Sequence, residues 1–223
     1  RDTDRSRGLG DVYKRQIKTI PNGILQANTY VLIDEETKEA AIIDSGGEFE
    51  IINDALEKYG AKLKYILNTH AHFDHVMGEK EAQERTGLPV YVHEDDKILL
   101  ENLKRQAAFF GIGEAEAPEN IKTFDENTVF TLGNQEIKVI HTPGHTPGSV
   151  CFLFGDALIS GDTLFYGSIG RTDFEGGSFA QISDSIQNKL FKLDENITVY
   201  PGHDAQTTIG YEKKYNSPFG KNN

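Results

Sequence analysis

Four side chains that can bind metal ions are concentrated in one short stretch of the sequence, "LNTHAHFDHVMG". They are His70, His72, Asp74 and His75, and the whole chain has only seven histidines. Imidazole nitrogens and carboxylate oxygens together suit zinc well, and iron or manganese acceptably. Because His70 and His72 are two positions apart, an extended or turning segment directs both side chains to the same side. The stretch therefore predicts a metal site.

Three further candidate ligands lie in separate segments of similar character. They are His145 in "HTPGHTPGS", Asp162 in "ISGDTLF" and His203 in "VYPGHD". Each lies just after a predicted strand, among the turn residues Gly, Pro or Thr. The ends of such strands converge at one edge of a sheet. Imidazole and carboxylate groups left there without partners would cost free energy, so we expect a divalent metal. Asp74 and His75 enter the next predicted helix and can face a second ion, which divides the ligands into two sets with a shared bridge.

The elements that must position these ligands alternate between strand-like and helix-like patterns. Strands are predicted over residues 17–21, 28–34, 39–44, 63–68, 88–93, 129–133, 136–141, 149–162 (a hairpin turning at Gly155-Asp156) and 197–203. Helices are predicted over residues 49–60, 74–87, 99–111 and 182–193, and residues 111–127 read as an acidic surface loop. Two sheets packed face to face with helices outside, or one doubly wound sheet, would both satisfy this α/β pattern.

The ligand motifs carry a family resemblance. "THAHFDH", "GHTPGS", "SGDTLF" and "YPGHD" occur in the order and character of the metallo-β-lactamase superfamily. The resemblance covers nearly all of residues 17–223 and implies one domain with the four-layer αβ/βα sandwich of that fold. It also implies which residues hold the metals. The first ion would have His70, His72 and His145, the second would have Asp74, His75 and His203, and Asp162 would bridge them.

The chemistry expected of such a centre is hydrolysis. Two cations about 3.5–4 Å apart can activate a water and polarise a carbonyl, and zinc lowers the pKa of bound water to about 7. Asp74 is the best candidate for a catalytic residue that orients this water. Within the superfamily, "GDTLFYGSIGRTDFEGG" and "TTIGYEKKYNSPF" resemble the compact glyoxalase II-like, hydroxyacylglutathione hydrolase-type enzymes, without the C-terminal helical region of longer members. That resemblance implies a thioester substrate such as S-lactoylglutathione and a substrate contact from Arg171.

Three other functions stay open at this point. Persulfide dioxygenases share the scaffold but use one iron, which here would be held by His70, His145 and Asp162. That assignment leaves His75 and His203 without a metal. A β-lactamase fits the "HTPGHTPGS" and "GRTDF" context less well, and a non-catalytic metal-binding module is the remaining class.

Several other residues have expected supporting roles. Asp44, at the end of a predicted strand, and His141, in "IHTPGH", are expected to orient metal ligands from behind, as metal-bound imidazoles require. His93 is expected to begin a helix or meet the surface. Cys151 alternates with aromatic residues in an apolar strand and is expected to be a buried hydrophobe.

Composition limits the partners and the setting. The net charge of −12 works against a nucleic-acid partner, which normally requires a basic patch. No apolar run reaches the roughly 18 residues of a membrane-spanning helix, and no signal peptide opens the chain. A single cysteine gives no disulfide framework, so we expect a cytoplasmic protein. Residues 1–16 match no element pattern and are interpreted as a non-native or disordered leader, and the sequence leaves the oligomeric state open.

Overall fold

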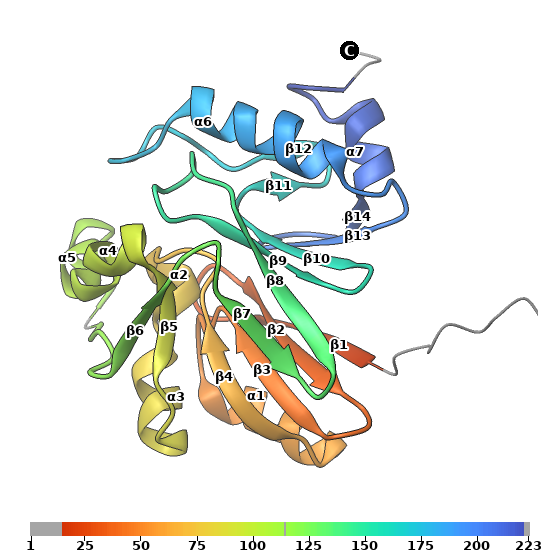
Figure 1. Ribbon diagram of the computed structural model, residues 1–223. Coiled ribbons are helices and arrows are strands. Elements are labelled where there is room, and N and C mark those ends of the chain that lie inside the picture. Colours follow the sequence, from red (N-terminus) through yellow and green to blue (C-terminus); the bar gives the residue numbers. More distant parts are fainter. Residues whose placement is uncertain (1–14, 114, 221–223) are drawn as a thin grey trace, which may run out of the picture.

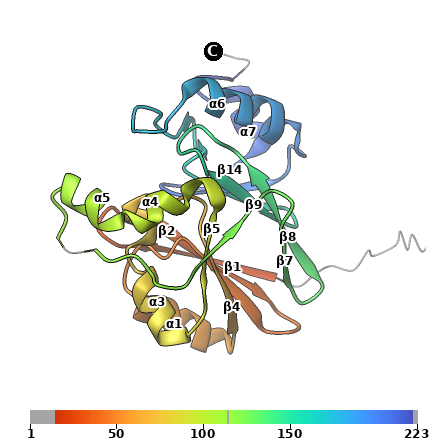
Figure 2. The same ribbon diagram turned by 60° about the vertical axis from the view of Figure 1, so that its left-hand side comes forward.

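Two β-sheets pack face to face, and helices cover the outer side of each (Figure 1). The computed structural model describes residues 15–113 and 115–220. Figure 2, turned by 60°, shows α1 (Phe49–Tyr59) and α3 (Glu79–Thr86) below the first sheet, with α6 (Phe179–Asp184) and α7 (Ile209–Tyr215) above the second. The four-layer αβ/βα sandwich expected from the sequence is confirmed.

The first sheet has the strand order β1-β2-β3-β4-β5-β6. Its strands are β1 (Arg15–Asn22), β2 (Ala27–Asp34), β3 (Glu39–Ile43), β4 (Lys62–Leu67), β5 (Val90–His93) and β6 (Ile121–Phe124). β1 to β3 are antiparallel neighbours, whereas β3 to β6 run parallel. Parallel neighbours need crossover connections, which the helices α1 and α3 provide.

The second sheet has the order β14-β13-β10-β9-β8-β7. Its strands are β7 (Val129–Leu132), β8 (Gln135–His141), β9 (Val150–Phe154), β10 (Ala157–Gly161), β13 (Thr198–Pro201) and β14 (Thr207–Thr208), and β11 (Leu164–Phe165) pairs separately with β12 (Ser168–Ile169). Hairpins join β7 to β8 and β9 to β10, and β10 lies parallel to β13.

Successive side chains of the central strands point to opposite faces of the sheet and so pack into separate hydrophobic cores. In β2, which is buried throughout, Val31 and Ile33 face the helices, while Tyr30 and Leu32 face the opposite sheet. A strand packed on both faces must be apolar on both, so its sequence reads as a continuous apolar run. A third core lies between the second sheet and its helices and includes Cys151, which is fully buried as expected.

Three predicted helices are interrupted. Residues 74–87 divide into α2 (Phe73–Val76) and α3, because the Gly78 N–H donates to the carbonyl of the distant Ser45 at 2.8 Å instead of within the helix. Gly78 packs so closely there that a Cβ would lie 1.9 Å from the carbonyl oxygen of Gly47. The helix around Leu99 to Phe110 divides at Asn102 into α4 (Lys97–Glu101) and α5 (Leu103–Phe109). The last long helix continues from α6 as a π-helical turn (Ser185–Lys189) and a 3₁₀ turn (Leu190–Lys192).

Two other boundaries differ from expectation. The supposed loop 111–127 contains β6, a short edge strand that was missed because only Phe124 of its four residues is buried. β1 begins at Arg15, so the last two residues of the interpreted leader 1–16 belong to the sheet, and the rest of that segment lies outside the described residues. Within residues 15–113 and 115–220, no helix combines the length and apolar character needed to span a membrane.

Candidate metal centre

The candidate ligands lie on loops that leave the carboxyl ends of four strands. His70, His72, Asp74 and His75 follow β4, and the other three ligands follow β8, β10 and β13 (His145, Asp162 and His203). Backbone hydrogen bonds join the two sheets at this edge: Val150 N–H donates to the Thr69 carbonyl at 2.8 Å, and Asn28 N–H donates to the Gly202 carbonyl at 2.7 Å. The site is therefore built across the top of both sheets.

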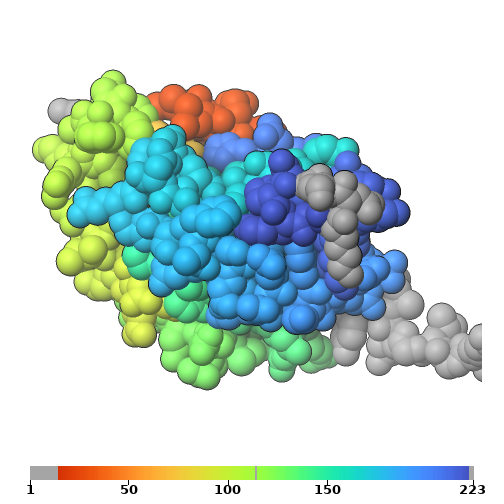
Figure 3. Space-filling view, turned by 90° about the horizontal axis from the view of Figure 1, so that it is seen from above, coloured from red at the N-terminus to blue at the C-terminus, as the bar shows by residue number. Residues whose placement is uncertain are grey.

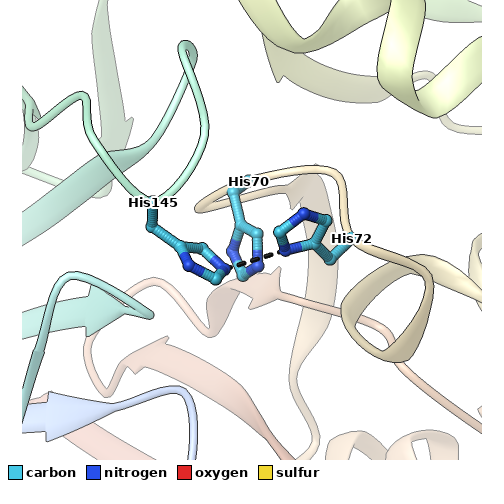
Figure 4. A group of neighbouring side chains, drawn as sticks. All are labelled: His70, His72 and His145. Carbon is cyan, nitrogen blue, oxygen red and sulfur yellow. Dashed lines mark hydrogen bonds between the residues drawn. The ribbon is translucent and has the colours of Figure 1, made fainter. Parts of the chain in front are cut away.

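The first ligand set is His70, His72 and His145, whose ligand nitrogens all lie within 4.8 Å of one another. Nδ1 of His72 lies 2.8 Å from Nε2 of His145, and the rings face a common point from three directions (Figure 4). The centroid of the His70 ring is 4.9 Å from that of His72 and 4.7 Å from that of His145. Three converging imidazoles match the open catalytic type of zinc site.

The second set is Asp74, His75 and His203, with ligand atoms again within 4.8 Å. Nε2 of His203 lies 3.2 Å from Oδ2 of Asp74, and Nε2 of His75 lies 3.7 Å from the same oxygen. Asp74 and His75 lie in the single helical turn Phe73–Val76, and the His75 ring lies beside the first set, with its centroid 4.2 Å from that of His70.

Asp162 lies between the two sets. Its Oδ1 is 3.3 Å from Nε2 of His75, and its Oδ2 is 3.5 Å from Nε2 of His145 and 3.8 Å from Nε2 of His203. One carboxylate thus reaches ligands of both sets with different oxygens, which is the geometry of a bridging ligand.

Hydrogen bonds made behind the rings fix the tautomers of three histidines. Thr69 Oγ1–H donates to Asp44 at 2.6 Å, so the Thr69 oxygen accepts from Nδ1–H of His70 at 3.1 Å. Nδ1–H of His75 donates to Asp44 at 3.0 Å, and Nδ1–H of His145 donates to the Arg171 carbonyl at 2.8 Å. Each ring therefore turns an Nε2 lone pair toward the centre, as metal ligands with outer partners do.

The atoms that face the centre fit divalent cations. Nε2 of His70, Nε2 of His75 and Oδ1 of Asp162 are buried and have no hydrogen-bond partner among the described residues. Buried polar atoms without partners are costly, and a cation would satisfy all three. The donor set of imidazole nitrogen and carboxylate oxygen suits zinc or iron.

Electrostatics differ between the two sets. Burial, and then the neighbouring His75, holds the pKa of His70 well below its usual value, and burial with His145 lowers the pKa of His72 to about 3. Burial opposes protonation of His75 as well, but the nearby negative charge of the Asp162 carboxylate outweighs burial and raises the pKa of His75 well above normal. The hydrogen bond that His203 donates to the carboxylate of Asp74 raises the pKa of His203. When no cation is bound, His75 and His203 therefore take up protons more readily than His70 and His72.

Asp96 is a supporting residue that the sequence analysis missed. Its buried carboxylate accepts from Ala71 N–H at 3.0 Å, Thr146 Oγ1–H at 2.7 Å and Gly148 N–H at 2.7 Å. Ala71 lies between two ligands and Thr146 follows His145, so Asp96 ties the two loops of the first set together. The one available signal was an acidic residue, in "HEDD", directly after a buried strand.

His141 and Arg171 have contacts of their own. Nε2–H of His141 donates to the Pro147 carbonyl at 2.9 Å, which braces the loop of His145, and its ring stacks on that of His93. Arg171 makes two hydrogen bonds of 2.7 Å to Asp173, and its guanidinium lies over the ring of Phe174, 3.8 Å from the centroid. Arg171 therefore contacts the centre through its backbone carbonyl, and a side-chain contact with substrate stays a prediction.

Comparison with known proteins places this centre in a family. The model of the metallo-beta-lactamase superfamily matches residues 22–203, a range that includes every candidate ligand. The chain belongs to the metallo-β-lactamase superfamily. The resemblance predicted from the four motifs is thereby confirmed, as is the fold class.

Members of the superfamily match along almost their whole length. The hydroxyacylglutathione hydrolase GloC of Haemophilus influenzae is 38% identical over 207 residues, which cover 91% of this chain and 97% of the relative. The crystal structure of BLEG-1, a B3 metallo-β-lactamase, matches with a TM-score of 0.83 and 37% identity over 90% of this chain and 98% of its own. TTHA1623, solved in a di-iron-bound form, matches with a TM-score of 0.81 and 34% identity over 89% of this chain and 98% of its own.

Proposed function

We propose that this superfamily member is a binuclear metal-dependent thioesterase that cleaves S-lactoylglutathione or a related hydroxyacyl thioester. The observation that carries the proposal is Asp162, whose two oxygens reach His75 and His145, one from each ligand set, at 3.3 and 3.5 Å. A shared carboxylate favours two ions acting together rather than one. We propose zinc as the metal, with iron or manganese as alternatives.

Two divalent ions bound here would supply an activated water and polarisation of the substrate carbonyl. The protein's part is to hold the groups around them. Asp74, buried and fixed through the contact of its Oδ2 with His203 at 3.2 Å, is placed to orient the attacking water. Burial opposes the ionised form of Asp74, but the hydrogen bond from His203 lowers its pKa, so Asp74 accepts a hydrogen bond at neutral pH.

The leaving group favours a thioester. Thiols have a pKa of about 8.5, so a thiolate departs without a strong general acid. Among the described residues, the titratable groups at the centre either belong to the two ligand sets or orient them. The similarity to GloC, a hydroxyacylglutathione hydrolase, supports the same substrate class.

Elemental analysis and a panel of substrates on one preparation test the proposal. We expect two divalent ions per chain and turnover of S-lactoylglutathione that chelation abolishes. One iron per chain, with oxygen consumption on glutathione persulfide and no thioester turnover, would indicate the dioxygenase. Hydrolysis of a β-lactam in preference to thioesters would indicate a lactamase, and metal content without turnover would leave a binding module.

A pair of neighbouring variants isolates the second ligand set. His203→Ala removes a ligand, whereas Asp204→Asn removes a charge from the exposed adjacent residue, whose positive φ of 64° asparagine tolerates. We expect His203→Ala to lose one ion and nearly all turnover, with unchanged circular dichroism. Asp204→Asn should retain both ions.

The remaining parts of the proposal concern partners and location. The substrate is a small molecule, and the net charge of −12 argues against nucleic acid as a partner. We propose a cytoplasmic protein without membrane attachment, in which the buried thiol of Cys151 stays reduced.

A further inference from the structure

A cavity of about 530 Å³ opens beside the first ligand set, within the size range of small-molecule pockets. It lies between α4–α5 and the segment around Phe174, and His72 forms part of its wall. Its large apolar wall residues are Ile98, Leu99, Phe109, Phe110 and Phe174, and the charged residues Asp95, Asp96, Arg105 and Glu175 also line it. The cavity therefore leads directly to a metal ligand and is mostly apolar.

The apolar wall is exposed to an extent that folding does not explain. Phe109 is 79% exposed and Ile98 is 70% exposed, the two highest values among the exposed large apolar side chains of the described residues, and Phe110 is 40% exposed. Each square ångström of apolar surface left in water forgoes about 25 cal/mol of stabilisation. Clustered apolar exposure of this kind marks a binding surface. In the view from above, the yellow-green residues of α4 and α5 lie at the left edge beside the blue segments (Figure 3).

Aromatic contacts connect this wall to the metal centre. The ring of Phe174 lies 5.6 Å from that of His72 and 5.6 Å from that of Phe110, which in turn lies 4.8 Å from Phe73. Arg171 holds Phe174 from the other side, with its guanidinium 3.8 Å from the ring centroid. A group bound against Phe174 and Phe110 would thus touch His72 at its inner end.

We propose that this cavity binds the acyl group of the thioester and that, among acyl and hydroxyacyl groups, the enzyme prefers those with a longer apolar chain, a specificity that rests on the proposed thioesterase function. The thiol carriers of cellular thioesters are polar and charged, so the acyl half is the half that an apolar wall can bind. In the reaction, the water oxygen bonds to the carbonyl carbon and the C–S bond breaks. One proton ends on the thiol, and the other is released as the acid ionises.

The test is a series of acyl-glutathiones from acetyl to butyryl to hexanoyl. Burial of one methylene is worth about 0.8 kcal/mol, so kcat/KM should rise about fourfold for each methylene that enters the cavity. Ile98→Asn and Phe109→Ser should reduce this rise in kcat/KM with chain length. The measure is the ratio of kcat/KM for hexanoyl-glutathione to that for acetyl-glutathione. Ile51→Asn, on the exposed face of α1 at 45% exposure, is the matched control and should keep the slope.

Calorimetry provides a comparison that does not require turnover. S-hexylglutathione should bind at least tenfold more tightly than S-methylglutathione, and equal affinities would contradict the proposal. If thioesters were hydrolysed but kcat/KM did not change with acyl chain length, the proposed acyl preference would be overturned and the proposed thioesterase function would stand. If kcat/KM depended on the size of the thiol instead of the acyl group, the cavity would be assigned to the thiol half of the thioester. Failure to hydrolyse any thioester would overturn both proposals.

Discussion

Nδ1 of His75 lies 3.0 Å from Oδ2 of Asp44, and both side chains are buried. The same carboxylate accepts from the backbone N–H of Thr69 at 2.7 Å and from its hydroxyl at 2.6 Å. Asp44 has a positive φ of 60°, a strained conformation for a residue other than glycine, and such strain often marks a functional position. One residue thereby orients His75 of the second set directly and His70 of the first set through Thr69.

Asp44→Asn should weaken metal binding without unfolding the protein. Asparagine tolerates the positive φ and keeps the shape, but its amide cannot accept all three hydrogen bonds. Loss of such an outer partner costs about 10- to 100-fold in metal affinity. Competition with a chelator measures the change. Asp34→Asn is the matched control, since Asp34 is a buried aspartate with several hydrogen bonds and no candidate ligand among its partners, and it should leave metal affinity unchanged.

Asp96→Ala should destabilise the metal-free protein by on the order of 3 kcal/mol, because it leaves the buried N–H groups of Ala71 and Gly148 without an acceptor and removes one partner of the Thr146 hydroxyl. Urea unfolding after chelation gives the value. We also expect weaker binding at the first metal, since both of its loops lose their common anchor. A change below about 0.5 kcal/mol would show that the loops are held by other contacts.

The two ligand sets should lose metal at different pH values. The pKa of His75 is raised well above its usual value and that of His203 is raised, so a cation that binds there competes with protons up to a higher pH. The lowered pKa of His70, and that of His72 at about 3, leaves these two ligands of the first set neutral down to acidic pH. Cobalt titrations between about pH 8 and about pH 5.5 should show the second ion weakening first as pH falls, with more protons released on its binding. Simultaneous loss of both ions would contradict this order.

Gly202→Ala should displace the proposed bridging ligand, Asp162, or its neighbour His75 by steric contact alone. A Cβ at Gly202 would lie 2.1 Å from Oδ1 of Asp162 and 2.8 Å from Cε1 of His75, so one of these ligands must move. We expect loss of at least one ion and of most activity, measured together on the same sample. Gly113→Ala, where a Cβ meets nothing within 4 Å, should behave like the parent protein. Retention of both ions in Gly202→Ala would show that the centre tolerates the displacement.

The sequence predicted the elements that follow from a local residue pattern and the ligands that lie at the ends of strands. The strand before His70 and the turn residues around His145 and His203 are enough to bring the ligands to one edge. The break at Gly78 was not predictable, because it results from a hydrogen bond to Ser45, far away in the sequence. β6 was missed for a similar reason, since it is a strand only through pairing with β5.

Asp96 shows the same limit at the site. Its own segment reads as an ordinary acidic helix start, and its role exists only because the loops of Ala71 and Thr146 meet above it. Most of the cavity wall from Ile98 to Phe110 lies in a segment that the sequence predicted only as one helix, over residues 99–111. The structure divides that helix at Asn102 and leaves Ile98, Phe109 and Phe110 exposed beside His72.

The central claim is that two ligand sets share Asp162 and so hold two ions side by side. Titration of the metal-free protein with manganese, followed by electron paramagnetic resonance, tests it most directly, because a shared carboxylate holds the ions about 3.5–4 Å apart, close enough to couple magnetically. We predict a coupled signal that is complete at two equivalents and is replaced by single-ion signals in Asp162→Ala. Saturation at one ion per chain, or two ions without coupling, would contradict the claim.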